Sequence, residues 1–285
     1  MIIEQNKIIQ TDGKRPIVYD VYYNQNNTPK PVVLFCHGYK GFKDWGAWHL
    51  VAEEFAKAGF FFLKFNFSHN GGTAEQPIDF PDLEAFSENT YTKELEDVVR
   101  VLKELENYSQ EANPTQVNII GHSRGGGLAL LASELHNNIL KAATWAGVSD
   151  FAPRFYEGTE AFAQWEKTGM AYVENARTHQ QLPHKFSFYE DFNANREAYS
   201  IKRAVSNTEK PLLIVHGTAD TTVELFEAEN LKKWAPQAKL HIIEGADHVF
   251  QSKHPWEAQT LSKEMKGAVR ETIAFFLNEI KWKNT

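Results

Sequence analysis

Mainly apolar runs of four to eight residues recur along the chain and predict strands that are buried on both faces of a parallel sheet. They lie at 32–36, 60–67, 117–120, 142–146, 212–215 and 240–243. Two earlier segments, Ile2–Ile9 and Ile17–Tyr23, flank the turn residues Thr-Asp-Gly-Lys at 11–14. This pattern predicts a hairpin, which would form an antiparallel edge of the sheet.

Between these runs, apolar residues recur every three or four positions and predict helices. The clearest stripe consists of Leu95, Val98, Val99, Leu102 and Leu105. Similar patterns include Leu50, Val51, Phe55 and Ala58 after Trp45, the run 128–132, and a long helix marked by apolar residues from Leu261 to Ile280. The alternation of strands and helices predicts an α/β fold with a mostly parallel sheet that is covered on both faces.

Residues 151–208, called the inserted segment below, interrupt this alternation and show no clear strand pattern. Eleven of these 58 residues are aromatic, a larger share than the 13% of the whole chain. We therefore predict a core domain of residues 1–150 and 209–285, with the inserted segment as a lid over a substrate. The candidates for substrate contact are Phe151, Phe155, Trp165 and Tyr172. The alternative is a helical decoration that packs on its own aromatic residues.

The strongest chemical signal is Gly121-His-Ser-Arg-Gly125, which lies between an expected strand and an expected helix. This context is typical of a nucleophile elbow, a sharp turn that requires small residues on either side of the serine. The turn would place the Ser123 hydroxyl at a helix N-terminus, where developing negative charge is favoured. The alternative is a glycine-rich turn without chemistry.

A serine hydroxyl needs a base at neutral pH, and His248 is the best placed of the 11 histidines. It follows the last expected strand, so it would lie at the carboxyl edge of the sheet. His37, His122 and His216 are better explained as structural residues, and we expect His122 to point away from Ser123.

The base needs a carboxylate to orient it. Asp220 follows the expected strand at 212–215, which gives the chain order Ser123, Asp220, His248. Two alternatives remain, namely Asp247 next to the histidine and Asp150 after another strand. We expect Asp247 to cap its own loop.

Acyl transfer also requires hydrogen-bond donors for an oxyanion. We expect the backbone amide of Arg124 as one donor and that of Tyr39 as the other, from the loop 37–45 that follows a strand. The Arg124 side chain would line the pocket or pair with a carboxylate of the lid. Residues 43–45 have no derivable catalytic role, and we expect them to fix this loop.

These residues resemble the α/β-hydrolase family over almost the whole chain. Residues 37–45 together with 121–126 are similar to its dienelactone-hydrolase-like and prolyl-oligopeptidase-like branch, and within it to small bacterial carboxylesterases, including cinnamoyl and feruloyl esterases. The resemblance implies a lid after the sixth strand and no cofactor. Ser123 departs from the cysteine nucleophile of dienelactone hydrolases, and the chain has no room for the propeller of prolyl oligopeptidases.

Composition narrows the remaining possibilities. The 285 residues allow one large domain or two small ones, and the net charge of −7 argues against nucleic-acid binding. The single cysteine, Cys36, excludes an internal disulfide and a cysteine-rich zinc site, and it falls in an expected strand. No zinc-protease motif is present, so we expect no metal.

The start of the chain lacks the apolar stretch of a signal peptide, and no window reaches the ~20 apolar residues of a membrane span. We therefore expect a cytoplasmic enzyme that neither enters a membrane nor binds nucleic acid, as a monomer or a homodimer. The predicted function is a serine hydrolase that cleaves small carboxylic esters with an apolar or aryl acyl group. The alternatives are a peptidase, amidase or thioesterase with the same triad, or a non-catalytic binding protein.

Overall fold

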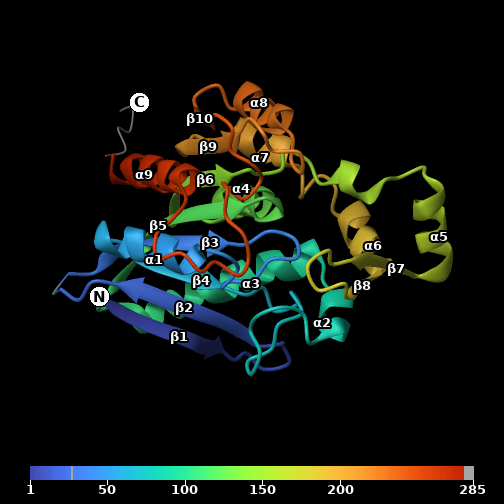
Figure 1. The fold of residues 1–285 in the computed structure, drawn as a ribbon, viewed down its shortest axis with the longest axis horizontal. Helices are drawn as coiled ribbons and strands as arrows, with labels where there is room; N and C mark the ends of the chain where they lie inside the picture. Colours follow the sequence, from blue (N-terminus) through green and yellow to red (C-terminus); the bar gives the residue numbers. More distant parts are fainter. Residues whose placement is uncertain (27, 279–285) are drawn as a thin grey trace.

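An eight-stranded sheet forms the centre of the computed structural model, which describes residues 1–26 and 28–278 (Figure 1). The strand order across this sheet is β1-β2-β4-β3-β5-β6-β9-β10. The strands span β1 Ile2–Ile9, β2 Ile17–Tyr23, β3 Lys30–Cys36, β4 Phe61–Phe65, β5 Ala112–His122, β6 Ile139–Trp145, β9 Leu212–Gly217 and β10 Lys239–Ile243. Each strand expected from the apolar runs is present.

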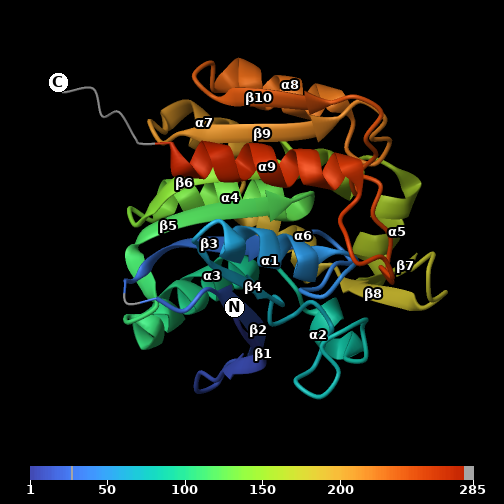
Figure 2. The same cartoon turned by 60° about the vertical axis from the view of Figure 1, so that its left-hand side comes forward.

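Strand direction follows the prediction. β1 pairs antiparallel with β2, and β2 pairs antiparallel with β4. The other neighbours in the sheet, from β4 with β3 through to β9 with β10, pair in parallel. The mostly parallel sheet with an antiparallel edge is therefore confirmed. The arrowheads of β5 and β9 in Figure 2 point toward the side on which the inserted segment lies.

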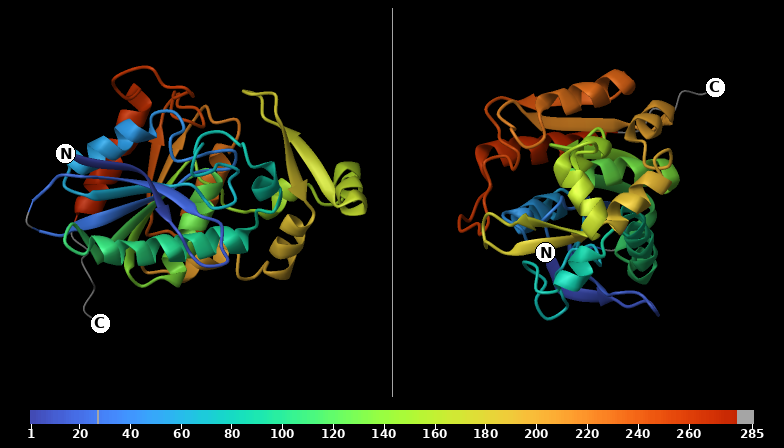
Figure 3. Two further views of the ribbon diagram at one scale, coloured as in Figure 1. Left: turned by 90° about the horizontal axis from the view of Figure 1, so that it is seen from below. Right: turned by 90° about the vertical axis from the view of Figure 1, so that its right-hand side faces the viewer.

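Helices cover both faces of the sheet, as Figures 2 and 3 show. The helices α1 Trp48–Lys57 and α9 Lys263–Leu277 pack on one face, and α3 Tyr91–Glu104, α4 Arg124–Leu135, α7 Ile201–Asn207 and α8 Leu225–Trp234 pack on the other. Leu261 precedes the Ser262 N-cap of α9 rather than lying in the helix, and Ile280 lies outside the described residues.

The inserted segment leaves the core after β6, the sixth strand, and projects to one side (Figures 1 and 3). The prediction that it has no strand is wrong. It contains a 3-10 turn Ala152–Phe155, α5 Glu160–Thr168, the antiparallel hairpin of β7 Met170–Glu174 and β8 Gln181–Lys185, α6 Ser187–Ala194, and α7, which belongs to the core face. β8 packs on the short helix α2 Leu83–Ser87.

A closed ring of alternating charges fixes the loop after β3. Lys43 Nζ lies 2.7 Å from Asp20 and 2.5 Å from Asp44, while Lys64 Nζ lies 2.6 Å from Asp20 and also bonds Asp44. Burial raises the pKa of Asp44, but Lys64 and Lys43 outweigh it and lower this pKa to about 2. The ring therefore ties the loop to β2 and β4.

Breaking this ring is expected to destabilise the protein. In Lys64→Met, the fully buried Asp20 carboxylate loses one of its two cations, so the free energy of unfolding should fall by about 3–5 kcal/mol. Urea denaturation followed by circular dichroism measures it. The control is Lys57→Met, whose half-exposed surface pairs predict a change within about 0.5 kcal/mol. Equal losses in both variants would contradict a special role for the ring.

Candidate active site

Ser123 occupies a sharp turn between the end of β5 and the start of α4. Its φ of 57° lies in the left-handed region, which non-glycine residues adopt only where the surrounding structure enforces it. A Cβ atom on Gly121 would lie 2.0 Å from the Gly125 carbonyl oxygen, and one on Gly125 would lie 2.4 Å from the Cys36 carbonyl oxygen. The turn is therefore restricted to glycine at both positions.

The structure brings Ser123, His248 and Asp220 together from three different strand ends. His248 Nε2 lies 3.0 Å from Ser123 Oγ, and His248 Nδ1 lies 2.8 Å from Asp220 Oδ2. A carboxylate can only accept, so Nδ1 carries the proton and Nε2 is left to accept from the serine hydroxyl. This is the arrangement that an imidazole base requires.

Asp220 is held as an ionised acceptor. Its Oδ1 accepts the backbone amides of Thr222 and Val223, each at 2.9 Å. Burial raises the pKa of Asp220, but hydrogen bonds from His216 and His248 outweigh burial and hold the pKa well below its usual range. An ionised carboxylate in this position can stabilise a protonated imidazole at His248.

The alternative carboxylates lie elsewhere. Asp247 Oδ1 accepts the amides of Val249 and Gln251, so it caps its own loop as expected. Asp150 is exposed, and its Oδ1 accepts the amide of Ala152.

Three further histidines have structural partners. His37 Nδ1 lies 2.9 Å from its neighbouring carbonyl at Gly38, and His216 Nε2 lies 2.7 Å from the Val223 carbonyl. Burial, reinforced by His248, lowers the pKa of His122 to about 3, and its Nε2 donates to the backbone carbonyl of His248 at 2.9 Å. His122 thus supports the histidine loop, a contact that the sequence pattern did not indicate.

The loop after β3 passes directly over Ser123. A Cβ atom on Gly38 would lie 2.8 Å from the Cβ of Ser123. Arg124 is the first residue of α4, so its amide has no partner within the helix. Gly38, the neighbour of Tyr39, and the start of α4 at Arg124 therefore lie beside Ser123. The assignment of the Tyr39 and Arg124 amides as oxyanion donors stays a prediction. Cys36 is fully buried.

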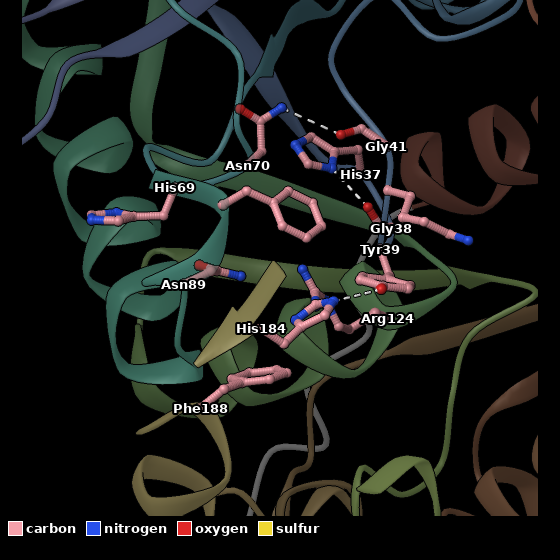
Figure 4. Close-up of a pocket in the computed structure, with 12 residues that line it drawn as sticks. His37, Gly38, Tyr39, Gly41, His69, Asn70, Asn89, Arg124, His184 and Phe188 are labelled. Carbon is pink, nitrogen blue, oxygen red and sulfur yellow. Dashed lines mark hydrogen bonds between the residues drawn. The ribbon is translucent and has the colours of Figure 1, made fainter. Parts of the chain in front are cut away.

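A small pocket opens beside this loop (Figure 4). Its walls come from the loop after β3, from segments near α2, and from the inserted segment. They consist of His37, Gly38, Tyr39, Lys40, Gly41, His69, Asn70, Phe86, Asn89, Arg124, His184 and Phe188.

Arg124 lines this pocket and pairs with Glu94 at 2.5 Å. Of the two alternatives expected for this side chain, the structure therefore shows the first, and the carboxylate partner belongs to α3 of the core rather than to the lid. The Arg124 side chain can reach Glu94 because α3 and α4 pack against each other.

None of the four aromatic residues predicted to contact substrate lines the pocket. Phe151 is buried and stacks on Tyr91 with ring centroids 4.2 Å apart, and Phe155 and Trp165 pack in the same aromatic core. Tyr172 is 63% exposed. The inserted segment reaches the pocket instead through His184 and Phe188, whose positions on β8 and α6 gave no sequence signal.

In residues 1–26 and 28–278, no cluster of three or more His, Cys, Asp or Glu side chains is arranged around a metal-sized position. Over the same residues, every helix is too short or too polar to span a bilayer.

Solved structures with low sequence identity share the fold. Est1E from Butyrivibrio proteoclasticus with bound ferulic acid matches with a TM-score of 0.71 and 18% identity, over 95% of this chain and 98% of that one. The esterase domain of a Rhodothermus marinus protein gives 0.60 and 17%, over 88% and 91%. A puromycin-hydrolyzing peptidase of Mycobacterium tuberculosis gives 0.65 and 20%, over 95% of this chain and 38% of the other.

Sequence comparisons give the family. The mouse protein "Serine hydrolase BPHL" is 25% identical over 171 residues, a match that spans 57% of this chain and only about half, 56%, of the relative. The model of the prolyl oligopeptidase family matches residues 50–266, which contain Ser123, Asp220 and His248. The chain therefore belongs to the prolyl oligopeptidase family of serine hydrolases and has the α/β-hydrolase fold.

Proposed function

We propose that this protein hydrolyses small carboxylic esters through an acyl-enzyme on Ser123. The observation that carries the proposal is the position of His248, hydrogen-bonded to the serine hydroxyl on one side and to a buried carboxylate on the other. A nucleophile, a base and an orienting group within hydrogen-bond reach of one another form the arrangement needed for covalent catalysis.

In the first half-reaction, Ser123 Oγ attacks the ester carbonyl carbon while its proton passes to His248 Nε2. The carbonyl oxygen becomes an oxyanion, for which the amides of Tyr39 and Arg124 are the proposed donors. Collapse of this intermediate breaks the bond to the alcohol oxygen, which takes the proton from His248. Asp220 stabilises the charged imidazolium in between.

In the second half-reaction, a water molecule replaces the alcohol. His248 removes a proton from the water as its oxygen attacks the acyl carbon, and the second tetrahedral intermediate uses the same two amides. The bond to Ser123 Oγ then breaks, and His248 returns the proton to the serine. The acid is released and the enzyme is restored.

The pocket supports an aryl or apolar acyl group. Phe86 and Phe188 supply aromatic walls beside Arg124, and Est1E, which has this fold, is known with ferulic acid bound. In the described part of the chain, Arg124 Nε and Asn89 Oδ1 are buried without a hydrogen-bond partner. One is a donor and the other an acceptor, so a polar substituent on the acyl group would find a partner for either kind of hydrogen bond if the pocket widened to admit it. The inserted segment acts as the lid.

A panel of substrates tests this proposal. We expect kcat/KM to be highest for esters such as methyl 4-hydroxycinnamate and 4-nitrophenyl butanoate, and lower for an acyl thioester and an aminoacyl 4-nitroanilide of similar size. Faster turnover of the anilide would favour a peptidase, and faster turnover of the thioester a thioesterase. An absence of turnover and of labelling by a fluorophosphonate would indicate a binding protein.

A further inference from the structure

We propose that the inserted segment positions the two oxyanion donors, with His184 and Phe188 acting through the side chains of Tyr39 and Arg124. The inference rests on the proposed function, which uses only the backbone amides of the latter two residues. It gives the segment a task beyond covering the substrate.

Tyr39 is joined directly to the inserted segment. Its hydroxyl lies 2.8 Å from Nε2 of His184 on β8, and the two rings lie 5.6 Å apart (Figure 4). Burial, together with Arg124 and Lys40, lowers the pKa of His184 to about 4, so a neutral imidazole faces the tyrosine. The bond crosses from the hairpin to the loop that carries one proposed donor.

The Arg124 side chain also contacts the inserted segment, in this case by stacking on an aromatic ring. Its guanidinium carbon lies 5.1 Å from the centre of the Tyr39 ring and 5.8 Å from the centre of the Phe188 ring on α6. Such cation–π contacts contribute about 0.5–2 kcal/mol, more when they are shielded from water. Glu94 pairs with the guanidinium as well. The side chains of both proposed donor residues therefore contact each other and the inserted segment.

The hairpin that carries His184 is itself fastened to the core. Leu182 of β8 is fully buried with Phe42, Phe80 and Phe86. Lys185 bonds Glu88 at 2.6 Å, and Gln180 Nε2 donates to the Phe80 carbonyl at 2.9 Å. Residues before and after His184 on this strand, Leu182 and Lys185, are therefore held by the rest of the protein. His184 can in turn fix the position of the Tyr39 ring.

The consequence concerns the transition state rather than substrate binding. An oxyanion donor acts at 2.7–3.1 Å, so a small displacement of the Tyr39 amide would weaken its hydrogen bond to the oxyanion. Binding of the ground-state ester would change little. Removal of a complete donor costs about 10²–10³ in kcat, and loosening one costs part of that.

The test uses Tyr39→Phe, which removes only the hydroxyl, and His184→Leu. With 4-nitrophenyl butanoate, kcat should fall about tenfold in each variant while KM changes by less than about twofold. The inhibition constant of a trifluoromethyl ketone, to which Ser123 adds to form an oxyanion, should rise by the same factor. The double variant should lose no more than either single one, because both remove one interaction.

Tyr156→Phe is the matched control, because Tyr156 belongs to the inserted segment and is 69% exposed. It should retain the kcat of the unmodified protein. Unchanged kcat in Tyr39→Phe, a rise in KM alone, or additive losses would overturn the inference. Tyr39→Phe keeps the packed ring, so it remains decisive if His184→Leu fails to fold. Failure of the proposed function is distinct, since the unmodified protein would then hydrolyse no ester.

Discussion

Replacing Ser123 with alanine is expected to lower kcat for ester hydrolysis by about 10⁵–10⁶-fold. The substitution removes the atom that would become acylated and leaves His248 without a hydroxyl to deprotonate. In serine hydrolases, loss of the nucleophile costs about as much as loss of the whole triad, because the three residues act as a unit. The activity that remains comes from binding and from the oxyanion donors.

A fluorophosphonate probe measures this directly, because it forms a covalent bond with an activated serine oxygen. The unmodified protein should be labelled once per chain, and Ser123→Ala should not be labelled. Ser206→Ala, at an exposed position on α7, serves as the control and should be labelled normally. Persistent labelling of the Ser123→Ala protein would exclude this residue as the nucleophile.

The second large effect is expected for Asp220→Asn, which should lower kcat by about 10⁴-fold. The amide nitrogen would donate to His248 Nδ1, so the proton of the imidazole would move to Nε2. That nitrogen could then no longer accept the serine proton. The backbone amides of Thr222 and Val223 would still have the side-chain oxygen as acceptor, which preserves the loop.

Asp247→Asn is the matched control, because it makes the same change one residue from His248. Asp247 Oδ1 only accepts backbone amides of its own loop, a role that an asparagine oxygen can fill. Its kcat should stay within about threefold of the unmodified protein, whereas a loss as large as that of Asp220→Asn would assign the orienting role to Asp247 instead. Circular dichroism melting of both variants checks that they fold.

Local signals in the sequence were sufficient for the core and for the residues around Ser123. The strands of the parallel sheet are buried on both faces, so their apolar runs identify them without further context, and β1 and β2 are found with the predicted bounds. The glycines at 121 and 125 indicate the elbow because the packing of two backbones admits no side chain there. Chain order then points to Asp220 and His248.

The inserted segment could not be predicted in the same way. β7 is exposed or half-buried along its length, and β8 contains Pro183, so neither strand shows an alternating or continuous apolar pattern. Helix α8 was missed as well. Its buried face includes Glu227, whose carboxylate accepts from Ser149 and Arg154, and a charged residue at a core position disrupts the expected stripe.

Contacts that depend on tertiary packing could not be predicted either. They include the carboxylate partner of Arg124 and the surroundings of the four aromatic residues that were expected to contact substrate. A sequence shows that an arginine follows the nucleophile, but the neighbour of its guanidinium depends on how α3 packs against α4. Aromatic residues in a projecting segment also have to pack it onto the domain, and Phe151, Phe155 and Trp165 belong to the same buried cluster as α3 and the sheet. Phe188 packs against this cluster as well as lining the pocket, and no sequence pattern distinguishes the two roles.

The arrival of the three proposed catalytic residues from the ends of β5, β9 and β10 has a consequence for biosynthesis. A ribosome synthesises the chain from the amino end. Ser123 is therefore made 125 residues before His248. Until β10 has paired with β9, a nascent chain holds Ser123 without His248 beside it. Under this assignment, newly made protein becomes reactive only after nearly all of the sheet has assembled.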